Sequence, residues 1–170
     1  MQSTRWIKAR MNKSGKPLLK LYLPALLAGA LVPLSLSPLS LWPSALLSVG
    51  ILYWLLQKTT SRQAALTGWW YGAGFFGVGV SWVFVSINLY GNASVGLAGF
   101  LTLLFVAGLA LCFVLQCWLC RKWASGIFPV VAFAASWVIG EWFRSWFLTA
   151  FPWLYLGYGH VTTSISGIAP

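Results

Sequence analysis

The chain has 170 residues, of which 59% are hydrophobic and 7% are charged, and its mean hydropathy is +0.81. A soluble domain carries about 25% charged residues, so this composition excludes that class and predicts a membrane protein. The formal net charge is +10, but the basic residues form short clusters between long apolar stretches. That distribution argues against a nucleic-acid partner and is typical of the loops between membrane helices.

The first 19 residues form a basic segment. Six of the eleven Lys and Arg residues fall within the first twenty positions: Arg5, Lys8, Arg10, Lys13, Lys16 and Lys20. Segment 1–19 is therefore expected to be cytoplasmic and to contact anionic lipid headgroups. The stretch from Leu21 to Gln57 is uncharged, whereas the apolar part of a secretory signal peptide has 7–15 residues. We therefore expect a retained membrane anchor.

The apolar stretches predict an all-α, polytopic bundle with about five transmembrane helices in a membrane domain over 20–148. A helix of 37 residues would be about 55 Å long, so 21–57 must cross a bilayer core of about 30 Å twice, reversing near Pro38 and Pro43. The uncharged stretch 63–120 reverses at the polar turn 88–92. The predicted crossings are near residues 20–36, 42–57, 63–87, 94–119 and 129–148.

Five crossings agree with the distribution of charge. They place the basic terminus, the Lys58 and Arg62 cluster and the Arg121–Lys122 pair on the cytoplasmic side. The turns at 37–43 and 88–93 and the aromatic loop that begins at 149 then lie on the outer side. Residues 149–170 are interpreted as this loop followed by the start of a further helix.

Glu141 is the single acidic residue of the chain, and Arg144 follows it by three positions. Eighteen uncharged residues precede Glu141 and 26 follow Arg144. An i, i+3 spacing places both side chains on one helix face within pairing distance. Charges at membrane depth are costly and face protein or a wet cavity. Two interpretations stay open: a structural ion pair that locks neighbouring helices, or the border of a site that handles a polar lipid group.

Small residues form a stripe along the third predicted helix. On a helical wheel four of them fall within about 40°: Gly68, Gly72, Gly79 and Ser86. Such a stripe favours close helix packing, although a substrate groove lined by glycine is the alternative. Gly74 and Gly77 lie on another face, which indicates a second tight neighbour.

The remaining residue types argue against a catalytic or metal site. Cys112, Cys117 and Cys120 fall in one apolar span, and His160 is the only histidine, so four ligands at zinc spacing do not exist. Glu141 and His160 would meet only if the aromatic loop folds back. We expect no metal and no cofactor, and no demanding covalent catalysis from this chain's own residues.

Three blocks of sequence resemble bacterial apolipoprotein N-acyltransferases, in the order that the family has them. They are SPLSLWPSA at 37–45, GAGFFGVGVSWVFVSI at 72–87, and EWFRSWFLTAFPWLYLGY at 141–158. The third block is the most specific, because it combines two charges with Phe-Pro-Trp and Gly-Tyr at fixed spacing. Gly159 and His160 stand where the family usually has more polar residues.

The resemblance implies eight membrane helices that hold a nitrilase-like α/β domain on the periplasmic side of the inner membrane. Such enzymes transfer an acyl chain from a phospholipid to the α-amino group of the diacylglyceryl-cysteine of an apolipoprotein. They use a cysteine thioester activated by a Glu and a Lys of the nitrilase-like domain. None of these catalytic positions exists in the 170 residues, so this chain is expected to be a fragment or truncated product, inactive alone, that contacts membrane lipids.

The resemblance also places the end of the fifth helix beneath the nitrilase-like domain. Trp153, Glu141 and Arg144 are therefore the candidates for positioning the phospholipid donor or the apolipoprotein acceptor. An interfacial anchor at Trp153 and a helix-locking ion pair are the structural alternative. The alternative function is a non-catalytic, multi-pass membrane transport or assembly subunit that kept the scaffold.

Overall fold

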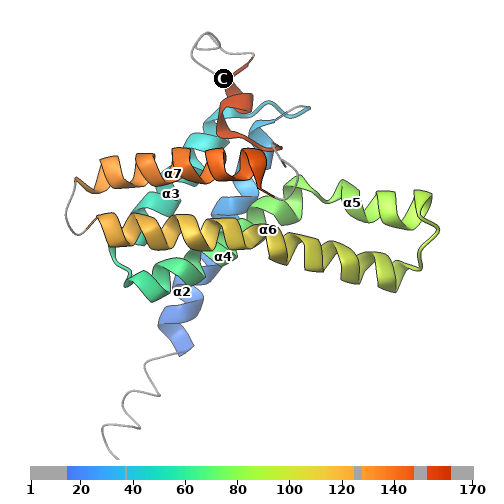
Figure 1. The fold of residues 1–170 in the computed structure, drawn as a ribbon, viewed down its shortest axis with the longest axis horizontal. Coiled ribbons are helices and arrows are strands. Elements are labelled where there is room, and N and C mark those ends of the chain that lie inside the picture. The colour runs from blue at the N-terminus through green and yellow to red at the C-terminus, as the bar shows by residue number, and fades with distance from the viewer. Residues whose placement is uncertain (1–14, 37, 125–127, 148–152, 162–170) are drawn as a thin grey trace, which may run out of the picture.

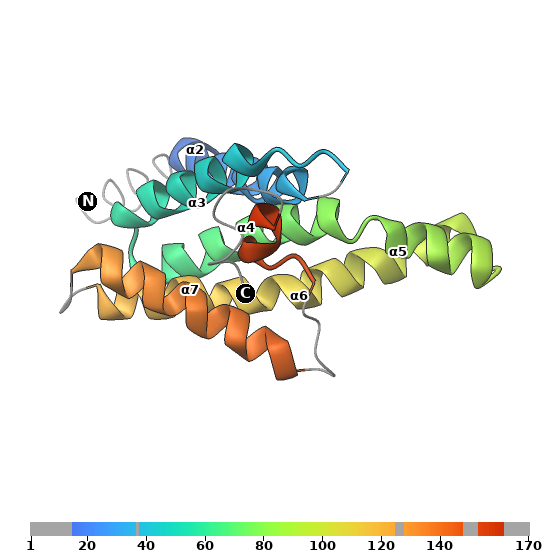
Figure 2. The same ribbon diagram turned by 90° about the horizontal axis from the view of Figure 1, so that it is seen from above.

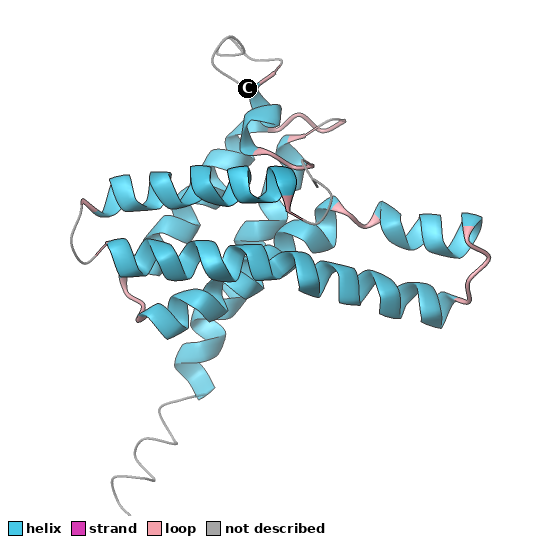
Figure 3. Ribbon diagram, in the orientation of Figure 1, coloured by secondary structure: helices cyan, strands magenta, loops and turns pink. Residues whose placement is uncertain are grey.

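The computed structural model describes residues 15–36, 38–124, 128–147 and 153–161, and these are helical apart from short turns. No strand occurs among these residues (Figure 3). The all-α prediction is thereby confirmed. Most of the basic segment 1–19 lies outside the described residues.

The helices follow one another with short connections. In chain order they are α2 (Gly15–Leu31), the 3-10 turn η1 (Val32–Ser35), α3 (Trp42–Gln57), α4 (Ser61–Gly79), α5 (Trp82–Val85), the π-helical η2 (Ser86–Tyr90), α6 (Val95–Trp123), α7 (Pro129–Trp146) and the 3-10 turn η3 (Leu156–His160). α3 has the bounds of the second predicted crossing. α2 begins before its predicted start at residue 20, so it includes the last part of the basic segment.

Local sequence accounts for where several helices begin. Thr60 and Gln63 form a capping box at the start of α4: the Gln63 backbone N–H donates to Thr60 Oγ1 (3.3 Å), and the Thr60 N–H donates to Gln63 Oε1 (3.0 Å). Ser94 caps α6 in a similar way by accepting from the Leu97 N–H (3.4 Å). Pro43 and Pro129 lie in the first turns of α3 and α7, where the missing N–H costs no helical hydrogen bond.

The third predicted crossing is not one straight helix. α4 ends at Gly79, α5 starts at Trp82, and the two parts are bent by 53°. Sharp kinks without proline occur at Gly and Ser positions, and Gly79 and Ser81 flank this break. The crossing predicted near 63–87 thus consists of two helical parts, with Ser86 beyond the break.

α4 is the central helix of the bundle. It lies between the α2–α3 pair on one side and the α6–α7 pair on the other (Figures 1 and 2). Close approach on both sides depends on glycine. A Cβ added at Gly68 would overlap the Phe113 carbonyl of α6, and one added at Gly74 would overlap the Leu26 carbonyl of α2. Small residues allow such approach where membrane helices pack without a hydrophobic driving force.

The core is aromatic and contains one hydrogen-bonded polar cluster. The largest fully buried side chains include Tyr71, Phe75 and Phe76 of α4 and Phe113 of α6. Ser48 Oγ donates to the Ala28 carbonyl (2.5 Å) and lies 2.8 Å from Tyr71 Oη. This cluster connects α2, α3 and α4, and it satisfies polar groups that would be costly to bury unpaired.

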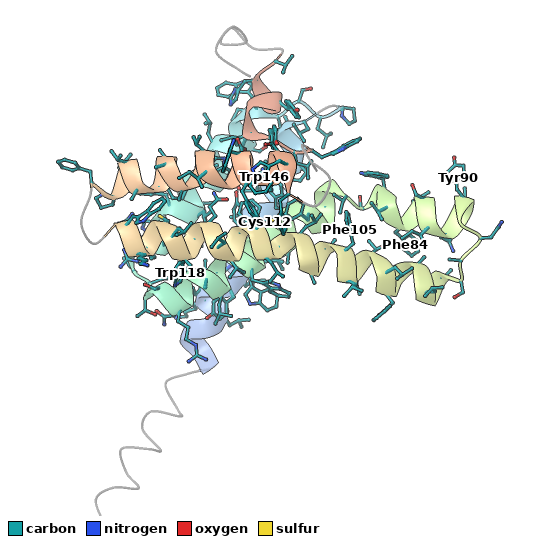
Figure 4. All side chains as sticks on the ribbon, viewed as in Figure 1. Phe84, Tyr90, Phe105, Cys112, Trp118 and Trp146 are labelled. Atoms are coloured by element: carbon teal, nitrogen blue, oxygen red, sulfur yellow. The ribbon has the colours of Figure 1, made fainter. Side chains whose placement is uncertain are left out.

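The apolar surface is large, and one part of it projects from the bundle. α5, η2 and the first half of α6 extend away from the other helices (Figure 1). Tyr90 lies near the tip of this projecting part, Phe84 on α5 and Phe105 on α6 (Figure 4). Tyr90 is 83% exposed.

By length and apolarity, one described helix, α6, can cross a membrane by itself, or two can if the bent pair of α4 with α5 and η2 counts as one crossing. Residues 19–35 and helix α3 are shorter apolar helices. The five crossings stay a prediction.

Candidate functional site

Glu141 and Arg144 lie at one end of the bundle, against a segment that we call the return loop (Trp153–Val161). The loop folds back from the end of α7 over the first helices (Figures 1 and 2). Gly159 lies against Ser35 of η1, where an added Cβ would stand 2.8 Å from Ser35 Oγ. The His160 ring lies 6.0 Å from the Trp42 ring of α3. Segments far apart in the sequence are therefore assembled at this end.

Glu141 attaches the return loop to α7. Its Oε1 atom accepts hydrogen bonds from Trp137 Nε1 (3.1 Å), one turn earlier on α7, and from the backbone N–H of Leu156 (3.0 Å). Hydrogen bonds to an ionised acceptor contribute about 1.5–3 kcal/mol each. The aromatic loop thus folds back as the Glu141–His160 hypothesis required, but it is the Leu156 backbone that binds Glu141, and His160 lies against Trp42.

Arg144 is a buried cation, with 4% of its side chain exposed. Its Nη2 atom lies 3.7 Å from Glu141 Oε1, which is the i, i+3 pair expected from the sequence. Four aromatic rings surround the guanidinium, with centroids 5.4–5.8 Å from Cζ: Phe75, Phe76, Phe113 and Tyr155. Each ring face attracts a cation, which partly compensates for lost hydration. We call these four rings the aromatic cage.

The cage does not complete the hydrogen bonding of Arg144. Its Nη1 atom is buried and has no hydrogen-bond partner in the part of the chain that the structure describes. A buried donor without a partner is costly and calls for an explanation, such as a role at a site. Sequence reasoning missed the cage, although Phe75 and Phe76 lie in the second family-like block, because their convergence on Arg144 requires α4, α6, α7 and the return loop together.

Tyr155 is the cage residue that belongs to the return loop. Partial burial raises the pKa of its phenol above the ordinary value, while the neighbouring Arg144 cation opposes that shift. The phenol is therefore neutral near pH 7 and presents its ring to the guanidinium without adding a second negative charge. Glu141 carries the negative charge at this place.

Trp153 and Leu154 form the start of the return loop. The Trp153 side chain is exposed, and its ring lies 5.6 Å from the ring of Trp82, the first residue of α5. Leu154 is buried, and its φ of 63° lies in the left-handed region, which costs an L-residue other than glycine about 1–2 kcal/mol. The indole at Trp153 is thus presented outward beside a strained, buried neighbour.

The structure places the glycine stripe against two different partners. Gly68 and Gly72 lie against α6, since a Cβ added at Gly72 would stand 2.9 Å from Ala110 Cα. Gly79 instead lies against the Leu154 side chain of the return loop. Ser86 is in η2, beyond the break, so the single stripe drawn on a straight helical wheel ends at the bend. Whether these residues act mainly in helix packing stays a prediction.

The chemical groups of the site include no set of metal ligands among the described residues. Cys112, Cys117 and Cys120 are free thiols on α6, and the last two are buried. Among the described residues, no three His, Cys, Asp or Glu side chains lie close enough to hold a metal ion. The described residues thus place one carboxylate, one caged cation and one exposed indole at the same end of the bundle.

Comparisons with known proteins agree on one family. The family model described as the apolipoprotein N-acyltransferase N-terminal domain matches residues 28–170. The chain is 50% identical over 153 residues to an apolipoprotein N-acyltransferase of Pseudomonas paraeruginosa, covering 88% of this chain and 30% of that protein. The corresponding protein of Coxiella burnetii is 42% identical over 150 residues, which is 86% of this chain and 31% of that protein. The chain thus spans about 30% of the length of these curated relatives.

Proposed function

Because the chain belongs to the apolipoprotein N-acyltransferase family, we propose that it forms the membrane part of an enzyme that N-acylates apolipoproteins. The acyl chain is transferred from a phospholipid to the α-amino group of the diacylglyceryl-cysteine of the acceptor. The observation that carries the proposal is the family match over 28–170, together with about 50% identity to a protein named for that activity. The thioester chemistry belongs to residues outside this chain.

The proposed place of action is the bacterial inner membrane, crossed five times with the amino terminus in the cytoplasm. The basic pairs at 58 and 62 and at 121 and 122 support this orientation. The antiparallel packing of α4 on α6 supports it as well, because Gly68 lies against Phe113 and Gly72 against Ala110. The same register brings Arg62, at the start of α4, toward Arg121, at the end of α6.

Within that enzyme we assign the return loop to substrate positioning. Glu141 and the caged Arg144 hold the loop in shape through Leu156 and Tyr155. Trp153 is 54% exposed at this end of the bundle. Tryptophan is favoured at the membrane–water interface, between lipid headgroups and acyl chains. In the proposed enzyme a phospholipid and an apolipoprotein approach the periplasmic catalytic domain beside this loop, and the loop itself takes no part in covalent chemistry.

The test is Trp153→Ala in the full-length enzyme, with Trp142→Ala as the matched control. Trp142 is 62% exposed on α7, and its ring packs on the Trp146 ring. We expect Trp153→Ala to form the acyl-enzyme thioester normally and to transfer the acyl chain poorly, with Trp142→Ala normal in both steps. Loss of the Trp153→Ala protein from the membrane would leave only a structural role. Unchanged transfer would remove Trp153 from the site.

The DNA downstream of codon 170 tests the proposed enzyme as a whole. A reading frame that continues into a nitrilase-like segment supports the acyltransferase. A stop codon followed by unrelated genes favours the transport or assembly subunit instead.

A further inference from the structure

The helix break between α4 and α5 is shaped by more than its own sequence. Val80, at the break, is buried, and Ser81 Oγ donates to the Val78 carbonyl (3.0 Å), so the end of α4 is satisfied locally. No proline lies between Gly79 and Trp82 to fix a direction. Gly79 and Ser81 permit a kink at this place, but they do not by themselves set the direction of the 53° bend.

Leu154 supplies a partner on one side of the break. Its side chain fills the space beside Gly79, where an added Cβ would overlap Leu154 Cδ1. It is 7% exposed and belongs to the hydrophobic core, although the return loop lies at the surface of the bundle. Its left-handed backbone (φ 63°) persists only where the surroundings determine it, and such strain gathers at functional sites.

Trp153 supplies the partner on the other side. Its ring packs on Trp82, the first residue of α5, at 5.6 Å between centroids and 37° between planes. Two consecutive residues of the return loop thus contact the last residue of α4 and the first residue of α5. Two positions later, the Leu156 N–H donates to Glu141 on α7 (3.0 Å). The loop therefore connects the break to α7.

We propose that Leu154 is a positioning residue: seated on Gly79, it fixes Trp153 against Trp82 and sets the direction in which α5 leaves α4. α5 otherwise packs on its own continuation η2 and on α6, so its direction sets how the projecting part stands relative to the bundle (Figure 1). The consequence for acyl transfer rests on the function proposed above, because Trp153 is the substrate-positioning candidate there. The coupling between Leu154 and the break does not depend on it.

The experiment is hydrogen exchange by mass spectrometry on the full-length enzyme in lipid nanodiscs, read at residues 80–90 and 153–160. Gly79→Ala and Leu154→Ala should each speed exchange in both segments about tenfold, the change that a loss of 1.4 kcal/mol in local stability produces. The double variant Gly79→Ala with Leu154→Ala places a methyl group in the vacated space, so its exchange should return toward wild type. Gly77→Ala is the matched control, since a Cβ there has no atom within 4 Å.

Four results would overturn the proposal. Wild-type exchange in Gly79→Ala would mean that Leu154 is not held there. Faster exchange in one segment only would show that loop and break are not coupled, and additive effects in the double variant would exclude a shared contact. If Gly79→Ala does not fold, the double variant decides: its recovery with near wild-type exchange supports the proposal, and its failure to fold overturns it. Acyl transfer, measured separately, tests the proposed function and not this coupling.

Discussion

Gly74 and Gly77 lie three residues apart in α4, one in a closed contact and the other in open space. The same Gly→Ala substitution can therefore be compared at the two positions. A Cβ at Gly74 would overlap the Leu26 carbonyl and stand 3.1 Å from the Ala30 backbone nitrogen, both of α2. These are backbone atoms, so relief requires the two helices to move apart. A Cβ at Gly77 has no atom within 4 Å.

The two Gly→Ala variants should change stability in opposite directions. Alanine is the better helix former by about 1 kcal/mol, so Gly77→Ala should be neutral or more stable by up to about that amount. Forcing a methyl group into a closed contact costs about 1–3 kcal/mol, so after the helix gain Gly74→Ala should be destabilised by up to about 2 kcal/mol. The gain in helix propensity is the same in both variants. The difference between their free energies of unfolding therefore measures the α2–α4 contact. We expect about 1–3 kcal/mol, or roughly 5- to 150-fold in the folding equilibrium.

The measurement is SDS-induced unfolding of the full-length protein in mixed micelles, followed by tryptophan fluorescence. Gly108→Ala in the middle of α6, where an added Cβ also meets open space, is a second control. Equal midpoints for Gly74→Ala and Gly77→Ala would refute the reasoning. α2 and α4 would then not approach each other through this glycine.

Three further predictions concern packing, charge and topology. Gly72→Leu should lower the amount of folded protein in the membrane, because Ala110 of α6 leaves no room, while Gly50→Leu, in open space, should accumulate normally. Glu141→Ala should lower the free energy of unfolding by about 3–6 kcal/mol, because two N–H donors lose a charged acceptor, and Glu141→Gln, which keeps an acceptor oxygen, should lose less. Equal losses would mean that these hydrogen bonds do not matter. Cysteine labelling should reach Asn92 from the periplasm and Lys58 from the cytoplasm, and labelling of both from one side would exclude five crossings.

The sequence determined the class of fold and the helical segments. Long uncharged stretches, prolines at 43 and 129 and the Thr60–Gln63 pair are local signals, and local signals are sufficient to form and start a helix. The i, i+3 spacing of Glu141 and Arg144 likewise determined their pairing, because both residues lie on one helix.

Only the tertiary structure decided what surrounds that pair. The aromatic cage joins rings from α4, α6 and the return loop, and Gly79 meets Leu154 across 75 positions of sequence. The bend after Gly79 also ended the stripe that a straight helical wheel extends to Ser86. A periodic pattern specifies which residues share a face of one helix. It does not specify which other helix or loop covers that face, since packing energy depends on atoms that the chain brings together only when it folds.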